Sequence, residues 1–225
     1  MRVILFGATG MVGRGVLHEC LLDPEIETAL SIGRTATGQK HEKLREIVRP
    51  DLFHYTDVED QLSGYDACFF CLGVSSIGMK ETDYRHVTYD LTLAAGEVLA
   101  RLDPGTTFIY VSGTGTDSSE RGRSMWARVK GATENALLRL PLRAAYMFRP
   151  GAIQPMHGEK PKARLMRAFY VLVAPLIPLL LRVFPKYVTT TERIGRAMIE
   201  VAKHGAPKKV LETQDINELA RTIAP

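Results

Sequence analysis

Seven consecutive residues near the start of the chain have the composition of a phosphate-binding turn, and they are Gly7, Ala8, Thr9, Gly10, Met11, Val12 and Gly13. They follow an apolar run at 2–6 and open a segment with helical spacing, so they lie between an expected strand and an expected helix. There Gly7 permits a tight turn, Gly10 permits close approach of a pyrophosphate, and Gly13 permits helix packing. Because a helix N-terminus also offers free N–H groups and partial positive charge, the segment predicts dinucleotide binding rather than a fortuitous glycine-rich turn.

The residues after the second expected strand, at 28–32, indicate which dinucleotide is bound. An acidic residue there would bond the ribose hydroxyls of NAD, but this chain has Gly33 and Arg34. An arginine can hold a 2′-phosphate through two parallel hydrogen bonds. The pattern favours NADP, with NAD as the alternative, and an ordinary surface charge is the other interpretation of Arg34.

Strand-like and helix-like segments alternate over the first 155 residues. Strands are expected at 2–6, 28–32, 44–48, 67–72, 107–112 and 144–148, and helices at 12–22, 82–102 and 125–138. Thr56 and Glu59 have capping-box spacing, which predicts a further short helix. The alternation predicts an α/β fold, with a doubly wound parallel Rossmann sheet of six or seven strands at 1–155 and a small helical C-terminal cap at 156–225. The dinucleotide is expected at the carboxyl ends of the strands, between the first and fourth.

Composition limits the class of protein and its partners. The 225 residues are 45% hydrophobic with net charge +4, as expected for one globular domain. Residues 121–186 hold thirteen Lys or Arg and two acids, which suits an anionic cofactor, a nucleic acid, a membrane surface or a solvated face. No nucleic-acid-binding motif is present, so no nucleic acid is expected. Three cysteines and no secretory leader indicate a reduced cytoplasmic setting, and Cys68 and Cys71 would point to opposite faces of a strand, so no metal is expected.

Four motifs together resemble one superfamily: the glycine turn, CFFCLG at 68–73, WARVKGATEN at 126–135 and FRPGAI at 148–153. Over most of residues 1–155 the chain resembles the atypical and extended short-chain dehydrogenase/reductases, the NAD-dependent epimerase/dehydratase type, and within them the Tat-interacting oxidoreductase branch. The resemblance implies contacts with adenine, the dinucleotide cleft, the nicotinamide ribose and the nicotinamide pocket. The residues implied, in that order, are Asp51 and Leu52, Leu72 and Gly73, Lys130, and Arg149 with Pro150.

The main departure from the family lies in its Tyr-x-x-x-Lys motif. Lys130 matches the lysine, but Trp126 stands at the position of the tyrosine. The phenol of that tyrosine normally exchanges a proton while hydride moves, and an indole does not titrate near neutral pH. Ser112 and Thr114 flank Gly113 at the expected strand end, and any of these three positions can align with the family's serine. The candidate catalytic residues are therefore Lys130, Ser112, Thr114 and Trp126.

The departure leaves three interpretations open. Tyr84 or Tyr89 supplies the proton, the reaction needs no acid at this position, or the chain binds NADPH without turnover as a sensor or scaffold. Trp126 itself is either a core residue or a stacking surface for substrate. The leading prediction is an NADP-dependent oxidoreductase or epimerase-like enzyme acting on a small-molecule carbonyl or alcohol.

The segment 160–184 is both apolar and basic. Only fourteen uncharged residues separate Arg167 from Arg182, fewer than the about 20 that span a membrane, and Pro175 and Pro178 interrupt them. The segment is expected to cover the substrate side of the cleft, to make a homodimer contact or to lie on an anionic membrane surface.

Overall fold

Seven parallel strands form the main sheet of the computed structural model, which describes residues 1–156 and 186–221. Their order is β3-β2-β1-β4-β5-β6-β9. The strands are β1 (Arg2–Phe6), β2 (Thr28–Gly33), β3 (Leu44–Val48), β4 (Ala67–Phe70), β5 (Thr107–Val111), β6 (Ala144–Arg149) and β9 (Val210–Glu212). The direction of strand order reverses between β1 and β4, so the predicted doubly wound Rossmann sheet is confirmed.

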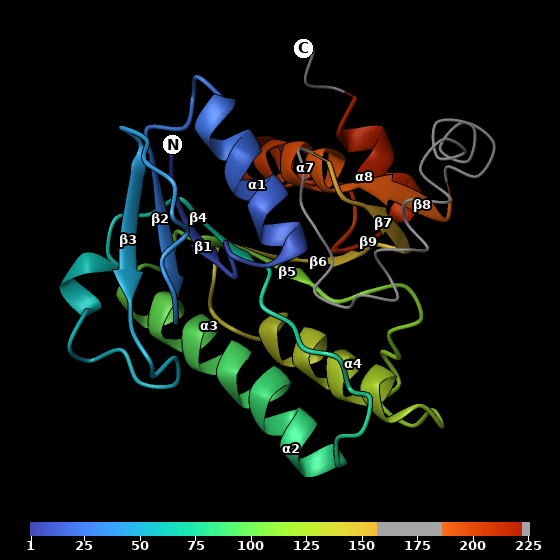
Figure 1. Ribbon diagram of the computed structural model, residues 1–225. Coiled ribbons are helices and arrows are strands. Elements are labelled where there is room, and N and C mark those ends of the chain that lie inside the picture. The colour runs from blue at the N-terminus through green and yellow to red at the C-terminus, as the bar shows by residue number, and fades with distance from the viewer. Residues whose placement is uncertain (157–185, 222–225) are drawn as a thin grey trace.

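Helices cover both faces of this sheet (Figure 1). On one face lie α1 (Met11–Leu22), α7 (Thr191–His204) and α8 (Thr213–Leu219). On the other lie α2 (Glu81–Arg85), α3 (Leu91–Leu102) and α4 (Met125–Leu137), with the π-helical turn η2 (His86–Asp90) joining α2 to α3. A separate two-stranded parallel sheet consists of β7 (Ala152–Gln154) and β8 (Val188–Thr190).

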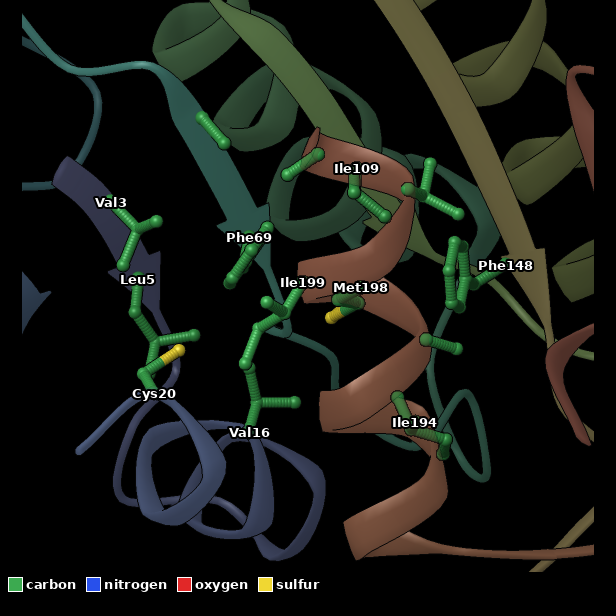
Figure 2. Close-up of a cluster of buried hydrophobic side chains, with 14 of the residues drawn as sticks. Val3, Leu5, Val16, Cys20, Phe69, Ile109, Phe148, Ile194, Met198 and Ile199 are labelled. Atoms are coloured by element: carbon green, nitrogen blue, oxygen red, sulfur yellow. The ribbon is translucent and has the colours of Figure 1, made fainter. Parts of the chain in front are cut away.

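The central strands are apolar on both faces, as the continuous hydrophobic runs in the sequence require. Figure 2 shows Val16 of α1 and Met198 of α7 close to Phe69 of β4, in the core beneath one face. Cys68 and Phe70 of the same strand belong to the core beneath the other face. Both faces are therefore filled by packing, and the loops at the carboxyl ends of the strands are left for binding and chemistry.

The short helix expected after Thr56 is not an α-helix, and its capping box was wrong. The segment forms a single 3₁₀ turn, η1 (Glu59–Gln61), whose N-cap is Val58. The Val58 N–H donates to the Tyr55 carbonyl and the Gln61 N–H donates to the Val58 carbonyl, each at 2.9 Å. The Val58 N–H, which a Thr56 side chain could have capped, is therefore already bonded to the backbone.

Residues beyond 155 contribute to the sheet as well as covering it. The edge strand β9 pairs with β6, and α7 packs so closely on α1 that a Cβ on Gly15 would lie 2.4 Å from the Thr191 Cβ. The segment 157–185, with its expected lid, dimer or membrane role, lies outside the described residues. None of the helices that the structure does describe combines the length and hydropathy needed to span a bilayer.

Candidate functional site

The predicted phosphate-binding turn joins β1 to α1. Gly7 has φ +84°, which favours glycine, and a Cβ there would lie 2.8 Å from the Cys71 carbonyl group and the Leu72 nitrogen. A Cβ on Gly13 would lie 2.1 Å from the Gly7 carbonyl oxygen, and the Gly10 N–H closes the turn by donating to that oxygen at 2.9 Å. Glycine is therefore required at Gly7 and Gly13 for the turn to pack against the end of β4.

The N-terminus of α1 begins directly after this turn. Its N-cap residue is Gly10, which has no side chain with which to cap the first N–H groups. Ala8 is buried, whereas Thr9, Met11 and Val12 are half-buried. A backbone cradle without Cβ atoms, at a helix N-terminus, has the donors and the partial positive charge that a diphosphate requires.

Arg34 is exposed immediately after β2, as its proposed role requires. Within the described residues, no hydrogen bond or ion pair engages its guanidinium. The nearby Glu46 of β3 accepts a hydrogen bond at 2.7 Å from the Thr37 N–H. The end of β2 therefore presents a cation able to bind an anionic group.

The expected adenine contacts Asp51 and Leu52 differ in their exposure. The Asp51 carboxylate accepts from the Phe53 N–H and lies 2.7 Å from the His54 Nδ1, and these contacts lower the pKa of Asp51. The Leu52 side chain is 4% exposed and belongs to the core. Only the carboxylate and the backbone of this pair can face a ligand.

Leu72 and Gly73 continue from β4 beside the glycine turn. Leu72 is half-buried and Gly73 is exposed, and the Cys71 N–H donates to the Phe6 carbonyl at 3.0 Å. This bond extends the pairing of β1 and β4 beyond the strands themselves. The structure thus places Leu72 directly beside Gly7, with Gly73 next along the chain.

The helix α4 places Trp126, Lys130 and Glu134 one turn apart on one face. The Lys130 Nζ donates to the Ser112 carbonyl oxygen at the end of β5. The Ser112 hydroxyl donates to Glu134 Oε1 at 2.5 Å and lies 3.2 Å from the Phe148 carbonyl oxygen. The candidate serine and lysine are brought together, but the serine hydroxyl is directed at a buried carboxylate.

Glu134 is the residue of this site that the sequence analysis missed. Its side chain is 1% exposed and forms a two-point ion pair with Arg149, whose Nε lies 3.0 Å from Oε1. Glu134 is one of only two acids in the basic segment 121–186, and it follows Lys130 by four residues. An acid on the same helical face as the lysine was the available signal.

The expected nicotinamide contact Arg149 is engaged by this pair. Its guanidinium also donates to the Ser118 hydroxyl at 2.5 Å and lies 3.5 Å from Glu212, and the hydrogen bonds that it donates to Glu134 raise its pKa. The positive charge of Arg149 is therefore paired with carboxylates of the protein itself. Pro150 is buried, and its carbonyl accepts from the Thr114 N–H at 3.0 Å.

Thr114 lies in the loop after β5, and Trp126 lies in the first turn of α4. The Thr114 hydroxyl donates to the Arg149 carbonyl at 3.0 Å. The Trp126 ring is half-buried against Gly115, where a Cβ would lie 3.5 Å from the ring carbon Cη2. Trp126 is therefore not a fully buried core residue, and part of its ring remains accessible.

The two alternative tyrosines differ in exposure. Tyr84 is 2% exposed, and burial raises its pKa. Tyr89 is half-buried, and its ring lies under the Arg85 guanidinium, 4.0 Å from its centre. Tyr84 is therefore not placed as an accessible proton donor, whereas Tyr89 stays open as an alternative.

The electrostatics of Lys130 differ from those of a surface lysine. Removal from water lowers its pKa to about 8, and the negative charge of Glu134 only partly opposes that effect. Cys68 and Cys71 show the opposite consequence of burial, because it raises their pKa and keeps them as neutral thiols. In the described part of the chain no cluster of His, Cys, Asp or Glu could hold a metal ion.

No protein-family model matches the chain, but individual proteins do. Protein FMP52, mitochondrial, from Meyerozyma guilliermondii is 25% identical over 236 residues, covering 98% of this chain and 96% of that protein. Other relatives with FMP52 names are also named mitochondrial. The cytoplasmic expectation is therefore contradicted. Its physical basis was weak, because the number of cysteines excludes a disulfide framework without selecting one reducing compartment over another.

Solved structures share the fold. The Bordetella bronchiseptica enzyme WbmF in complex with NAD⁺ superposes with a TM-score of 0.68 at 15% identity, covering 98% of this chain and 76% of that one. UDP-glucuronic acid 4-epimerase from Bacillus cereus in complex with NAD gives a TM-score of 0.66 at 14% identity, with coverages of 99% and 83%. The chain therefore has the Rossmann-like α/β fold of NAD-dependent epimerases, which agrees with the superfamily resemblance at the level of fold.

Proposed function

We propose that this protein is an NADP-dependent oxidoreductase or epimerase-like enzyme acting on a carbonyl or alcohol of a small molecule. The observation that carries the proposal is the β1–α1 turn. Its backbone packs closely on itself and on the end of β4 because Gly7 and Gly13 have no Cβ, and it leads directly into the N-terminus of α1, which no side chain caps. Arg34 at the end of β2 favours NADP over NAD, because its guanidinium suits a 2′-phosphate. The NAD complexes of the structural neighbours support a nicotinamide dinucleotide in general.

The described residues would hold this cofactor at three places. The glycine turn would bind the diphosphate, Asp51 would accept from adenine, and Lys130 would lie beside the nicotinamide ribose. The cofactor supplies hydride chemistry, and the protein supplies its position and the electrostatic surroundings.

A second candidate function follows from Trp126. Because the family's proton-exchanging phenol is replaced by an indole, the chain is alternatively an NADPH-binding sensor or scaffold without turnover. The proposed homodimer and membrane contacts of residues 160–184 would suit such a role.

Two measurements separate these functions. Fluorescence titration with NADPH and NADH measures binding, and we expect NADPH to bind more tightly. Cofactor oxidation with a panel of aldehydes and ketones then measures turnover by the wild type and by Trp126→Tyr. Turnover by the wild type supports the enzyme. An inert wild type with an active Trp126→Tyr supports the binding protein, and failure to bind either nucleotide overturns both.

A further inference from the structure

The hydroxyl groups nearest the Trp126–Lys130 face already have acceptors. Ser112 donates its proton to Glu134 Oε1 at 2.5 Å, and Thr114 donates to the Arg149 carbonyl at 3.0 Å. Proton delivery from either would break a hydrogen bond that joins β5 to α4 or to β6. These two hydroxyls are thus poorly placed to replace the missing phenol.

The acidic groups that pack against this helix are also occupied. Glu134 forms a buried ion pair with Arg149, which donates hydrogen bonds to it. The loop carrying Asp117 packs on α4, since a Cβ on Gly131 would lie 1.8 Å from the Asp117 carbonyl oxygen. The Asp117 carboxylate accepts from Ser119 and from the Gly122 N–H, and these bonds lower its pKa. Asp117 is therefore ionised at neutral pH, and Glu134 is engaged by Arg149.

Lys130 differs from these hydroxyls and carboxylates because it carries N–H protons that are not all engaged in hydrogen bonds. It lies one helical turn from Trp126, and its Nζ reaches the carboxyl end of β5. An ammonium group has three N–H donors, and the bond to the Ser112 carbonyl uses one. Two donors remain for a ligand at the place where the family's tyrosine and lysine act together.

We propose that the Lys130 ammonium itself donates the proton to the substrate oxygen, in place of the missing tyrosine. The inference rests on the proposed reductase function. While hydride from the reduced nicotinamide cofactor, which becomes oxidised, adds to the carbonyl carbon and the C=O π bond breaks, the oxygen takes one proton from Nζ and becomes a hydroxyl. Lys130 is left as a neutral amine, which regains a proton from water before the next turnover. In alcohol oxidation the neutral amine accepts that proton instead.

The electrostatic surroundings suit this role. Removal from water lowers the pKa of Lys130 to about 8, while Glu134 on the same helix opposes the shift. The charge of Glu134 is largely neutralised by Arg149 of β6, and Asp117 is bonded within its own loop. An amine whose pKa lies near the working pH can both release and regain a proton. An ordinary lysine, with a pKa of about 10.4, holds its proton too strongly to release it readily at that pH.

The first test measures the titration of Lys130 directly, without turnover. Protein labelled with ¹³C-lysine is titrated by NMR from pH 6 to 11, and the resonance absent in Lys130→Arg is assigned to Lys130. We expect its midpoint at about 8, against about 10.4 for exposed lysines. A midpoint near 10.4 overturns the inference, whatever the activity.

The second test compares Lys130→Arg with the wild type. Arginine keeps the positive charge but does not release its proton, so we expect NADPH affinity within about threefold and a kcat lower by about 100- to 10,000-fold. Wild-type carbonyl reduction should fall above pH 8, and alcohol oxidation should rise there. Lys208→Arg, at an exposed ion pair with Asp215, is the control for lysine replacement as such.

The outcomes separate the inference from the function on which it rests. Full activity in Lys130→Arg, or a pH profile without a transition near 8, overturns the role of Lys130 alone. A wild type that fails to bind NADPH, or binds it and reduces no carbonyl in the panel, overturns the proposed function and this inference with it. Loss of kcat with retained binding, together with the NMR midpoint at about 8, supports both.

Discussion

The β1–α1 turn and the Trp126–Lys130–Glu134 face of α4 lie at the same end of the sheet, but they depend on different parts of the chain. In the turn, backbone geometry determines the local structure, because glycine at Gly7 and Gly13 avoids contacts of 2.8 and 2.1 Å. On α4, side chains determine it: Trp126 stands where the family that the chain resembles has tyrosine, and Glu134 forms a buried pair with Arg149. The comparison shows that the turn depends on residues adjacent in the chain, whereas the α4 face depends on contacts between separate elements.

The largest effect is expected from removing the buried carboxylate on α4. Glu134→Ala leaves Arg149 buried without its main partner and frees the Ser112 hydroxyl from its acceptor. Breaking a buried pair in this way destabilises a protein by about 3–5 kcal/mol. Urea unfolding should show that loss. The control is Glu81→Ala, which removes a more exposed pair with Arg128 and should cost less than about 1 kcal/mol. Equal losses in the two variants would contradict the role assigned to Glu134.

A change in the turn should affect binding next most strongly. In Gly13→Ala the new Cβ collides with the Gly7 carbonyl oxygen, so α1 must shift. Its N-terminal N–H groups then no longer point at the expected diphosphate. Loss of one charge-assisted bond corresponds to about 1.5–3 kcal/mol, or about 10- to 100-fold weaker NADPH binding by fluorescence titration. Gly33→Ala is the control for a glycine-to-alanine change as such, because the added Cβ would meet no atom nearer than 3.7 Å. Its thermal stability should equal that of the wild type. Unchanged affinity in Gly13→Ala would remove the basis for the phosphate site.

A smaller and more selective effect is expected at Arg34. Arg34→Ala removes an exposed guanidinium that no other described residue engages, so stability should stay within about 0.5 kcal/mol. NADPH binding should weaken about tenfold while NADH binding stays unchanged, because only the former carries the 2′-phosphate. Parallel losses for both nucleotides would show that Arg34 does not select the cofactor.

The smallest change concerns the pH dependence of stability. Burial lowers the folded-state pKa of Lys130 to about 8, against about 10.4 in an unfolded chain. Between these values the unfolded chain binds more protons at this site, so stability from Lys130 rises with pH over that window. Urea unfolding of wild type and Lys130→Met at pH 7.5 and 10 should therefore diverge in favour of the wild type. Parallel curves would mean that Lys130 titrates normally.

Local patterns were sufficient for most of the fold. Apolar runs buried on both faces and glycines between strand and helix are set by neighbouring residues, so the Rossmann sheet and the turn at Gly7–Gly13 could be predicted. The capping-box spacing at Thr56 failed because the Val58 N–H, a donor within reach of such a cap, binds the Tyr55 carbonyl instead. Residue spacing alone does not indicate whether a backbone N–H will bind a capping side chain or a nearby backbone carbonyl.

The partners of charged side chains could not be predicted in this way. Arg149 was expected at the nicotinamide pocket because its motif resembles the family, but its guanidinium turns to Glu134, fifteen residues away in the chain. Such pairs depend on how α4 lies against β5 and β6, which no local pattern contains.

The amino-acid order by itself determined the alternation of elements, the glycine turn, the cation after β2 and the Trp126–Lys130 spacing. Only the tertiary structure decided that Ser112 faces a buried carboxylate, that β9 completes the sheet, and that burial of the Lys130 side chain lowers its pKa. The reason is physical. Secondary structure follows short-range sterics and periodic burial, whereas ion pairing and the pKa of a side chain depend on desolvation by residues distant in the chain.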